Sequence, residues 1–393
     1  MSRACVLNSG YLQEIHRGVL LAVVLSTLAA RLLLRSTFLA LAVLLAAANL
    51  RASDDPVVLA RAGLGAIEAG RFGDALDAFT KAAAMRPGDA SMCFGAGVAA
   101  FMLGKDDVAQ RHFECALTRN PEFLSASTWL GDLHYRAGRL NEAISIYEAA
   151  LRRSPEAWEV RRQLDNWRKE LLLQSRFREV RSEHFTALFE TASDEALARD
   201  VVTRLETAYQ RIGDALGLHP SRPITVLLYT RAQFNDITSL AGWSVAGYDG
   251  RIRVPLSGAA AQPEELDRLL SHEFVHAVVA TVGGRTVPAW MNEGLATVLE
   301  PGGLEPNPAQ PTGTSGRSDV SKLPESFVGL SARKAETAYS SAARAVRHLI
   351  EQRGVATVVA LLTDMGRGTP FPDAFQSRVG MRYEDFAALV AQH

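Results

Sequence analysis

The sequence has little cysteine and almost no net charge. Its 393 residues include only 3 cysteines, which excludes a disulfide-stapled scaffold and a cysteine-rich zinc module. The 42 basic and 43 acidic residues leave a formal net charge of -1, so nucleic acid is not an expected partner. Aromatic residues make up 7% and hydrophobic residues 48% of the chain, a globular composition that excludes a largely disordered or collagen-like protein. The length predicts about two or three domains.

A long apolar segment stands near the N-terminus. Residues 18–50 are interrupted only by Arg31 and Arg35, and neither apolar piece alone reaches the ~20 residues of a membrane-spanning helix. The second piece follows arginines and ends in small residues, which is typical of a signal-peptide core. We predict that residues 1–52 are a signal peptide or an uncleaved membrane anchor, with a buried core helix as the alternative. The soluble part would then lie outside the cytoplasm, in the bacterial periplasm.

Residues 56–155 repeat three times with a period of 34 residues. The small residues of the repeat allow two antiparallel helices to approach, and an aromatic residue fills the space between successive hairpins. One glycine serves the turn inside each hairpin, and proline ends the second helix. The repeated positions are Gly63, Gly97 and Gly131; Gly70, Gly104 and Gly138; Ala75, Ala109 and Ala143; Phe79, Phe113 and Tyr147; Ala82, Ala116 and Ala150; and Pro87, Pro121 and Pro155.

This pattern resembles the tetratricopeptide repeat (TPR), which implies an all-α solenoid. Three repeats and a capping helix at 156–173 are expected to occupy residues 53–175. The resemblance implies a groove that recruits a protein partner or substrate, and a helical spacer that recruits nothing is the alternative. Cys93 and Cys115 fall in one predicted hairpin, where they form either a disulfide or two small buried thiols.

Beyond residue 180 the period disappears, and a second domain is expected over residues 180–393. A proline- and glycine-rich segment at 301–334 is expected to be a flexible loop. Helices and glycine turns at 335–393 are expected to close the cleft of this domain. In this domain we expect strands at 182–190, 223–230 and 250–256, and helices at 194–216 and 263–283.

Two histidines and a glutamate inside the helix expected at 263–283 carry a metal-site pattern. Because His272 and His276 differ by about 40° in direction around an α-helix, both imidazoles face one point, as a tetrahedral zinc ion requires. Glu273 borders the same point and would take a proton from the attacking water. A following helix would bring Glu293 alongside as a third ligand. Two histidines and one glutamate leave a fourth position open, which is typical of catalytic zinc.

Residues 180–393 resemble a gluzincin metallopeptidase of the thermolysin-like clan. HEFVH at 272–276 matches the H-E-x-x-H motif, and WMNEGLA at 290–296 is similar to the W-x-N-E-G-x-A element. The layout resembles that of bacterial exported proteins that join TPRs to a peptidase MA-like domain. The resemblance implies an α+β zincin-like fold, Zn²⁺ as the cofactor, the same three residues as its ligands and the same glutamate as the general base.

No glutamate before the metal motif matches the G-x-M-E-N element of the family's aminopeptidases, which favours an endopeptidase. Tyr339 opens a helix at a place where gluzincins often carry a tyrosine, and it is the candidate donor to the oxyanion. His348 and Tyr248 are the alternative donors. We therefore expect an exported zinc endopeptidase that hydrolyses peptide bonds and has a TPR module. A TPR adaptor with an inactive or weakly active peptidase-like domain, and a purely structural zinc site, are the alternatives.

Overall fold

The computed structural model describes residues 55–237, 247–255, 262–303, 327 and 330–392. The predicted signal peptide or anchor, residues 1–52, lies outside the described residues, as does most of the predicted loop at 301–334. Within the described part of the chain, no helix combines the length and the hydrophobicity that crossing a membrane demands.

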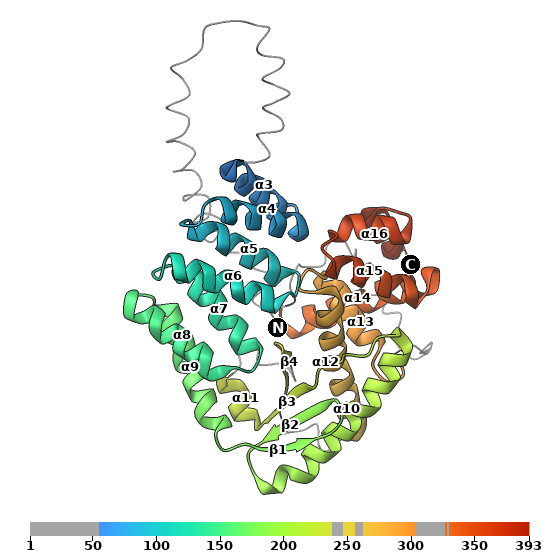
Figure 1. Ribbon diagram of the computed structural model, residues 1–393. Coiled ribbons are helices and arrows are strands. Elements are labelled where there is room, and N and C mark those ends of the chain that lie inside the picture. The colour runs from blue at the N-terminus through green and yellow to red at the C-terminus, as the bar shows by residue number, and fades with distance from the viewer. Residues whose placement is uncertain (1–54, 238–246, 256–261, 304–326, 328–329, 393) are drawn as a thin grey trace, which may run out of the picture.

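The N-terminal region is a solenoid of antiparallel helix pairs that stack along one side of the molecule (Figure 1). Gly70, Gly104 and Gly138 end the first helix of each pair at φ values of 70°, 72° and 76°, a left-handed conformation that glycine adopts at little cost. The predicted role of these glycines in the turns is therefore confirmed. The helices are α3 (Pro56–Glu68), α4 (Phe72–Met85), α5 (Ala90–Met102), α6 (Asp106–Arg119), α7 (Leu124–Arg136), α8 (Leu140–Arg153) and α9 (Trp158–Gln174).

The repeated glycines inside the helices make room for the repeated aromatic rings. A Cβ atom at Gly63 would lie 2.7 Å from the ring of Phe79, and one at Gly97 would lie 2.6 Å from the ring of Phe113. Cys93 of α5 and Cys115 of α6 form a disulfide with a Cα–Cα distance of 5.9 Å. The structure thus pairs the two cysteines for which the sequence left two interpretations open.

A small mixed sheet follows the solenoid, with strand order β1-β2-β3-β5-β4. The β2–β3 and β3–β5 pairs are parallel, whereas β1 and β4 run antiparallel to their neighbours. The alternating pattern at 182–190 forms β2, whose Phe185, Ala187 and Phe189 are buried. The strands are β1 (Arg178–Arg181), β2 (Phe185–Phe189), β3 (Ile224–Tyr229), β4 (Gly247–Tyr248) and β5 (Ile252–Pro255).

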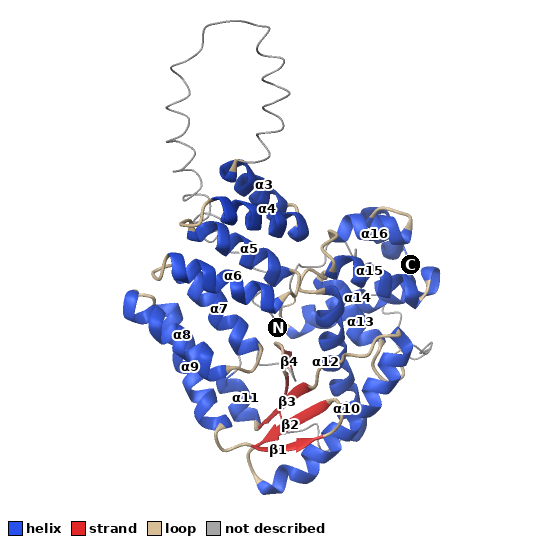
Figure 2. Cartoon of the chain, in the orientation of Figure 1, coloured by secondary structure: helices blue, strands red, loops and turns tan. Residues whose placement is uncertain are grey.

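Helices pack against this sheet and fill the remainder of the C-terminal region (Figure 2). One hydrophobic core joins β2, β3 and β5 to the helices α10, α12, α13, α14 and α15. The helices are α10 (Glu195–Leu216), α11 (Arg231–Ile237), α12 (Pro263–Gly283), α13 (Ala289–Val298), α14 (Ala332–Arg353), α15 (Val355–Gly366), α16 (Phe371–Val379) and α17 (Tyr383–Gln392), with a short 3-10 turn at Ala192–Asp194.

All three repeats touch the C-terminal region through glycines at or next to the turn between their two helices. A Cβ atom added at Gly104 would lie only 3.3 Å from the Cα of Gly284, at the end of α12. The edge of the solenoid is therefore seated on three separate segments of the C-terminal region. The contacts join Gly73 to Gly368, Gly104 to Gly284 and Gly138 to Arg251.

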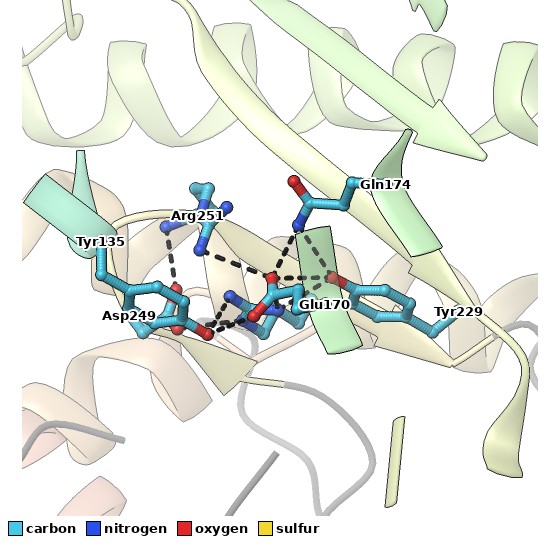
Figure 3. Close-up of polar contacts among 7 residues, drawn as sticks. Tyr135, Glu170, Gln174, Tyr229, Asp249 and Arg251 are labelled. Carbon is cyan, nitrogen blue, oxygen red and sulfur yellow. Dashed lines mark hydrogen bonds and ion pairs between the residues drawn. The ribbon is translucent and has the colours of Figure 1, made fainter. Parts of the chain in front are cut away.

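A buried network of charged and aromatic residues joins α9 to the sheet (Figure 3). Glu170 of α9 is 0% exposed, and its carboxylate accepts hydrogen bonds from Tyr135 (2.6 Å), Arg253 (2.9 Å) and Tyr229 (3.1 Å). The Nε of Arg253 also donates to Asp249 at 2.9 Å. Burial raises the pKa of Asp249, but the guanidinium groups around it lower the pKa to about 2. We call these five residues the Glu170 network.

Candidate metal centre

The three predicted ligands converge on one point between α12 and α13. His272 and His276 lie on adjacent turns of α12, with ring centroids 4.8 Å apart. After the turn at Gly284, α13 packs against α12 and brings Glu293 to the two rings. The Oε2 atom of Glu293 is 3.4 Å from Nε2 of His272 and 3.4 Å from Nε2 of His276. The structure thus brings together three residues that the sequence separates by up to 21 positions.

Neighbouring helices hold α12 and α13 in this arrangement. Arg211 of α10 donates to Ser271 of α12 at 3.0 Å and to the backbone oxygen of Leu299, at the end of α13, at 2.8 Å. At Gly294 a Cβ atom would lie 2.5 Å from the backbone oxygen of Ala342 in α14. The absence of a side chain there lets α13 approach α14 closely, next to the Glu293 position.

Oxygen atoms fix the outward-facing nitrogen of each histidine. His272 Nδ1 is 2.8 Å from Oε1 of Glu300, and His276 Nδ1 is 3.1 Å from Oδ1 of Asn292. Each oxygen acceptor favours a proton on Nδ1, so that Nε2, which is directed at Glu293, is the nitrogen left to bind a metal. Such acceptors orient metal-binding histidines in proteins. Neither Glu300 nor Asn292 was among the candidate residues chosen from the sequence.

Two buried carboxylates at this point have oxygen atoms without hydrogen-bond partners. Glu273 and Glu293 are 5% and 3% exposed, and among the described residues the Oε2 atom of each lacks a partner. Leaving such an atom unsatisfied is costly. His272, Glu273 and His276 offer ligand atoms within 4.8 Å of one another. Imidazole and carboxylate donors are a set that suits Zn²⁺, so the residues present fit a zinc ion.

The electrostatics of the cluster favour a cation. Burial alone lowers the pKa of His272, but the nearby carboxylates of Glu293 and Glu300 raise it to about 10. Burial also lowers the pKa of His276, and the Glu293 carboxylate raises it above the ordinary value. Burial raises the pKa of Glu293, yet the two histidines hold it well below its usual range. The carboxylates thus stabilise positive charge at the point they share.

The pKa of Glu273 shifts in the opposite direction from that of Glu293. Burial raises the pKa of Glu273, and the nearby Glu293 carboxylate adds to this effect, while the two histidines oppose it. The net shift is upward, which makes Glu273 a better proton acceptor than an ordinary carboxylate.

Tyr339 of α14 lies beside the cluster. Its ring centroid is 6.2 Å from that of His272 and 5.0 Å from that of Phe327. Burial raises the pKa of the Tyr339 hydroxyl, and the carboxylates of Glu293 and Glu273 raise it further. The hydroxyl therefore stays protonated at neutral pH and can act as a hydrogen-bond donor.

Tyr248 and His348, the two alternative donors to the oxyanion, have different neighbours from Tyr339. Tyr248 of β4 faces Arg136 and Arg285 at the contact with the repeats, where burial raises the pKa of its hydroxyl and these arginines oppose that shift. His348 packs against the ring of Phe386 at a centroid distance of 5.9 Å. Of the three candidates, the structure brings Tyr339 to the histidine cluster.

Comparisons with known proteins identify the N-terminal region. Residues 60–109 and 104–157 match the family model of the tetratricopeptide repeat. No curated protein matches the chain. Among solved structures, the chain is similar to the first TPR domain of Spaghetti (RPAP3) bound to the HSP90 peptide SRMEEVD, with 25% identity and a TM-score of 0.29 over 30% of this chain and 98% of that one. The match to the family model shows that the N-terminal region contains tetratricopeptide repeats, as the 34-residue period predicted.

Proposed function

We propose that the protein is a zinc-dependent endopeptidase whose C-terminal region is a gluzincin-like domain. His272, His276 and Glu293 would hold the ion. The observation that carries the proposal is the convergence of two imidazole Nε2 atoms on one carboxylate oxygen, at 3.4 Å each. The oxygen acceptors on both Nδ1 atoms support it, because they set the tautomer that a metal requires. We further propose that the protein works in the periplasm, exported or anchored through residues 1–52.

In this proposal each residue around the ion has a separate role in peptide-bond hydrolysis. Bound zinc would polarise the scissile carbonyl and lower the pKa of the attacking water. Glu273 takes the proton of that water and passes it to the leaving amine, for which its raised pKa is suitable. Tyr339 donates a hydrogen bond to the oxygen on which negative charge develops. Glu300 and Asn292 keep the two imidazoles in the ligating tautomer.

The TPR module would recruit the protein that is cleaved, or a partner that delivers it. Stacked helical repeats create extended surfaces suited to peptides and proteins. If the metal centre proves inactive, this surface becomes the working part of the protein, which is then an adaptor.

Metal analysis of the purified full-length protein tests the proposal. We expect about one zinc per chain, as for a catalytic site with three protein ligands, and its loss in the His272→Ala/His276→Ala double variant. His348→Ala is the control, because this histidine packs against Phe386 and its variant should retain zinc. Absence of zinc from the wild-type protein after reconstitution would contradict the proposal and favour the adaptor.

Replacing Glu300 should weaken zinc binding without abolishing it. Glu300→Gln removes the negative charge that accepts from His272 at 2.8 Å, and loss of such an acceptor lowers metal affinity about 10- to 100-fold. Competition with a chromophoric chelator measures the change. Glu264→Gln is the matched control, because it removes an exposed carboxylate in the first turn of α12, two helical turns before His272. Equal affinities of the two variants would exclude an orienting role for Glu300.

A further inference from the structure

The connection between the two ligand-bearing helices is fastened to the repeats. Arg285 lies in this connection, and its guanidinium forms a two-pronged ion pair with Asp106, at the start of α6, with distances of 2.6 and 3.0 Å. The same group donates to the backbone oxygen of Phe101 at 2.7 Å and lies 4.0 Å from the centroid of its ring. The backbone N–H of Arg285 donates to the oxygen of Met102 at 3.0 Å. One residue thus makes four kinds of contact with the second repeat.

Gly284, the residue before Arg285, packs closely against the second repeat. Gly284 has φ +69°, and a Cβ atom there would lie 3.1 Å from the backbone of Leu103 and 3.2 Å from the oxygen of Met102. Backbone therefore packs directly against backbone at this point. Together, Gly284 and Arg285 fix where α12 ends and where the chain turns toward α13.

The contact of Arg285 with the second repeat lies close in sequence to the helix that carries Glu293. Pro288 follows Arg285 by three residues, and Ala289 begins α13, which carries Glu293. A short connection of this kind transmits a displacement of Arg285 to α13. Ligands must be held within about 0.5 Å of a productive geometry. The distance from Glu293 to the two histidines therefore depends on where the second repeat holds Arg285.

We propose that Arg285 and Asp106 are positioning residues of the metal centre, so that the TPR module sets the ligand geometry as well as presenting a binding surface. This inference rests on the proposed zinc site. The ion pair is suited to the role because a bidentate pair between arginine and a carboxylate fixes orientation as well as distance. The Arg285 side chain is 13% exposed and the Asp106 side chain is 42% exposed, so solvent reaches the pair from the carboxylate side only.

The variant Asp106→Asn tests the proposal, because it keeps the shape of the side chain and removes its charge. We expect zinc affinity to fall about tenfold, comparable with the loss of an orienting partner, and the visible spectrum of the Co²⁺-substituted protein to change. Arg285→Lys, which keeps the charge without the fork, should show an intermediate loss. Asp107→Asn is the matched control, because Asp107 is exposed at the same helix start and should leave both readouts unchanged.

Hydrogen exchange separates this proposal from the proposed function. In the metal-free variant Asp106→Asn, the amides of α13 should exchange faster, while those of α10 stay as in the wild type. Wild-type exchange in α13, or wild-type zinc affinity with an unchanged Co²⁺ spectrum, would overturn the positioning role. Failure of the wild-type protein itself to bind zinc would overturn the proposed function, and exchange in α13 would still decide whether Asp106 positions Glu293.

Discussion

Glu273→Gln should abolish peptide-bond cleavage and leave the zinc content of the protein unchanged. Glu273 is 5% exposed and lies within the histidine cluster, and the proposed ligand set of two histidines and Glu293 does not include it. The amide keeps the size of the side chain but cannot accept the proton of the attacking water. Loss of a general base typically lowers the rate 10²- to 10⁴-fold. Cleavage of an unfolded protein substrate, measured beside metal content, gives both quantities.

The control for this variant lies on the same helix. Glu264→Gln removes an exposed carboxylate in the first turn of α12 and should leave the rate unchanged. Full cleavage by Glu273→Gln in a preparation free of other peptidases would contradict the assignment of the base. A parallel loss of zinc would instead mean that Glu273 itself helps to hold the ion.

Glu170→Ala should cost about 3–5 kcal/mol of unfolding free energy, the range for breaking a buried ion pair by removal of one partner. Arg253 is 2% exposed and would lose its bond to Glu170, while the hydroxyls of Tyr135 and Tyr229 would lose an acceptor. Urea unfolding followed by circular dichroism measures the change. A loss below about 1 kcal/mol would contradict this account of the Glu170 network.

The matched control is another glutamate of α9. Glu159 is exposed in the first turn of the helix, where a carboxylate contributes about 0.3–1 kcal/mol through the helix dipole. Glu159→Ala should therefore lie well below Glu170→Ala in its effect. Similar losses in both variants would mean that helix electrostatics, and not the buried network, account for the change.

The repeats and the histidine pair were predictable because local geometry determines them. The 34-residue period follows from the contacts within each helical pair, such as that between Gly63 and Phe79. The convergence of His272 and His276 follows from the pitch of one helix. Glu300 lies two residues beyond the end of α13, so helical periodicity does not place it, and its contact with His272 becomes visible only in the fold.

The Glu170 network could not be predicted because it joins residues that are far apart in sequence. The segment at 250–256 alternates arginine with aliphatic residues, which predicts a strand with one solvated face. The strand exists as β5, but α9 and Tyr135 of α7 cover the face that carries Arg253. A carboxylate in a polar helix such as α9 is predicted to be exposed, because its buried partners come from other elements of the fold. The two-residue β4 is too short to produce any pattern.

Because all three repeats pack against the C-terminal region, separating the two regions would expose the surface that they share. A fragment that begins at β1 would carry Arg251 and Arg253 to its surface without Glu170, and the turn at Gly284 without the backbone that supports it. The match to the family model ends at residue 157, immediately before the cap helix α9 begins at Trp158. A cut at such a boundary would divide a single contact surface, so the repeats and the candidate metal centre are best produced and crystallised as one piece.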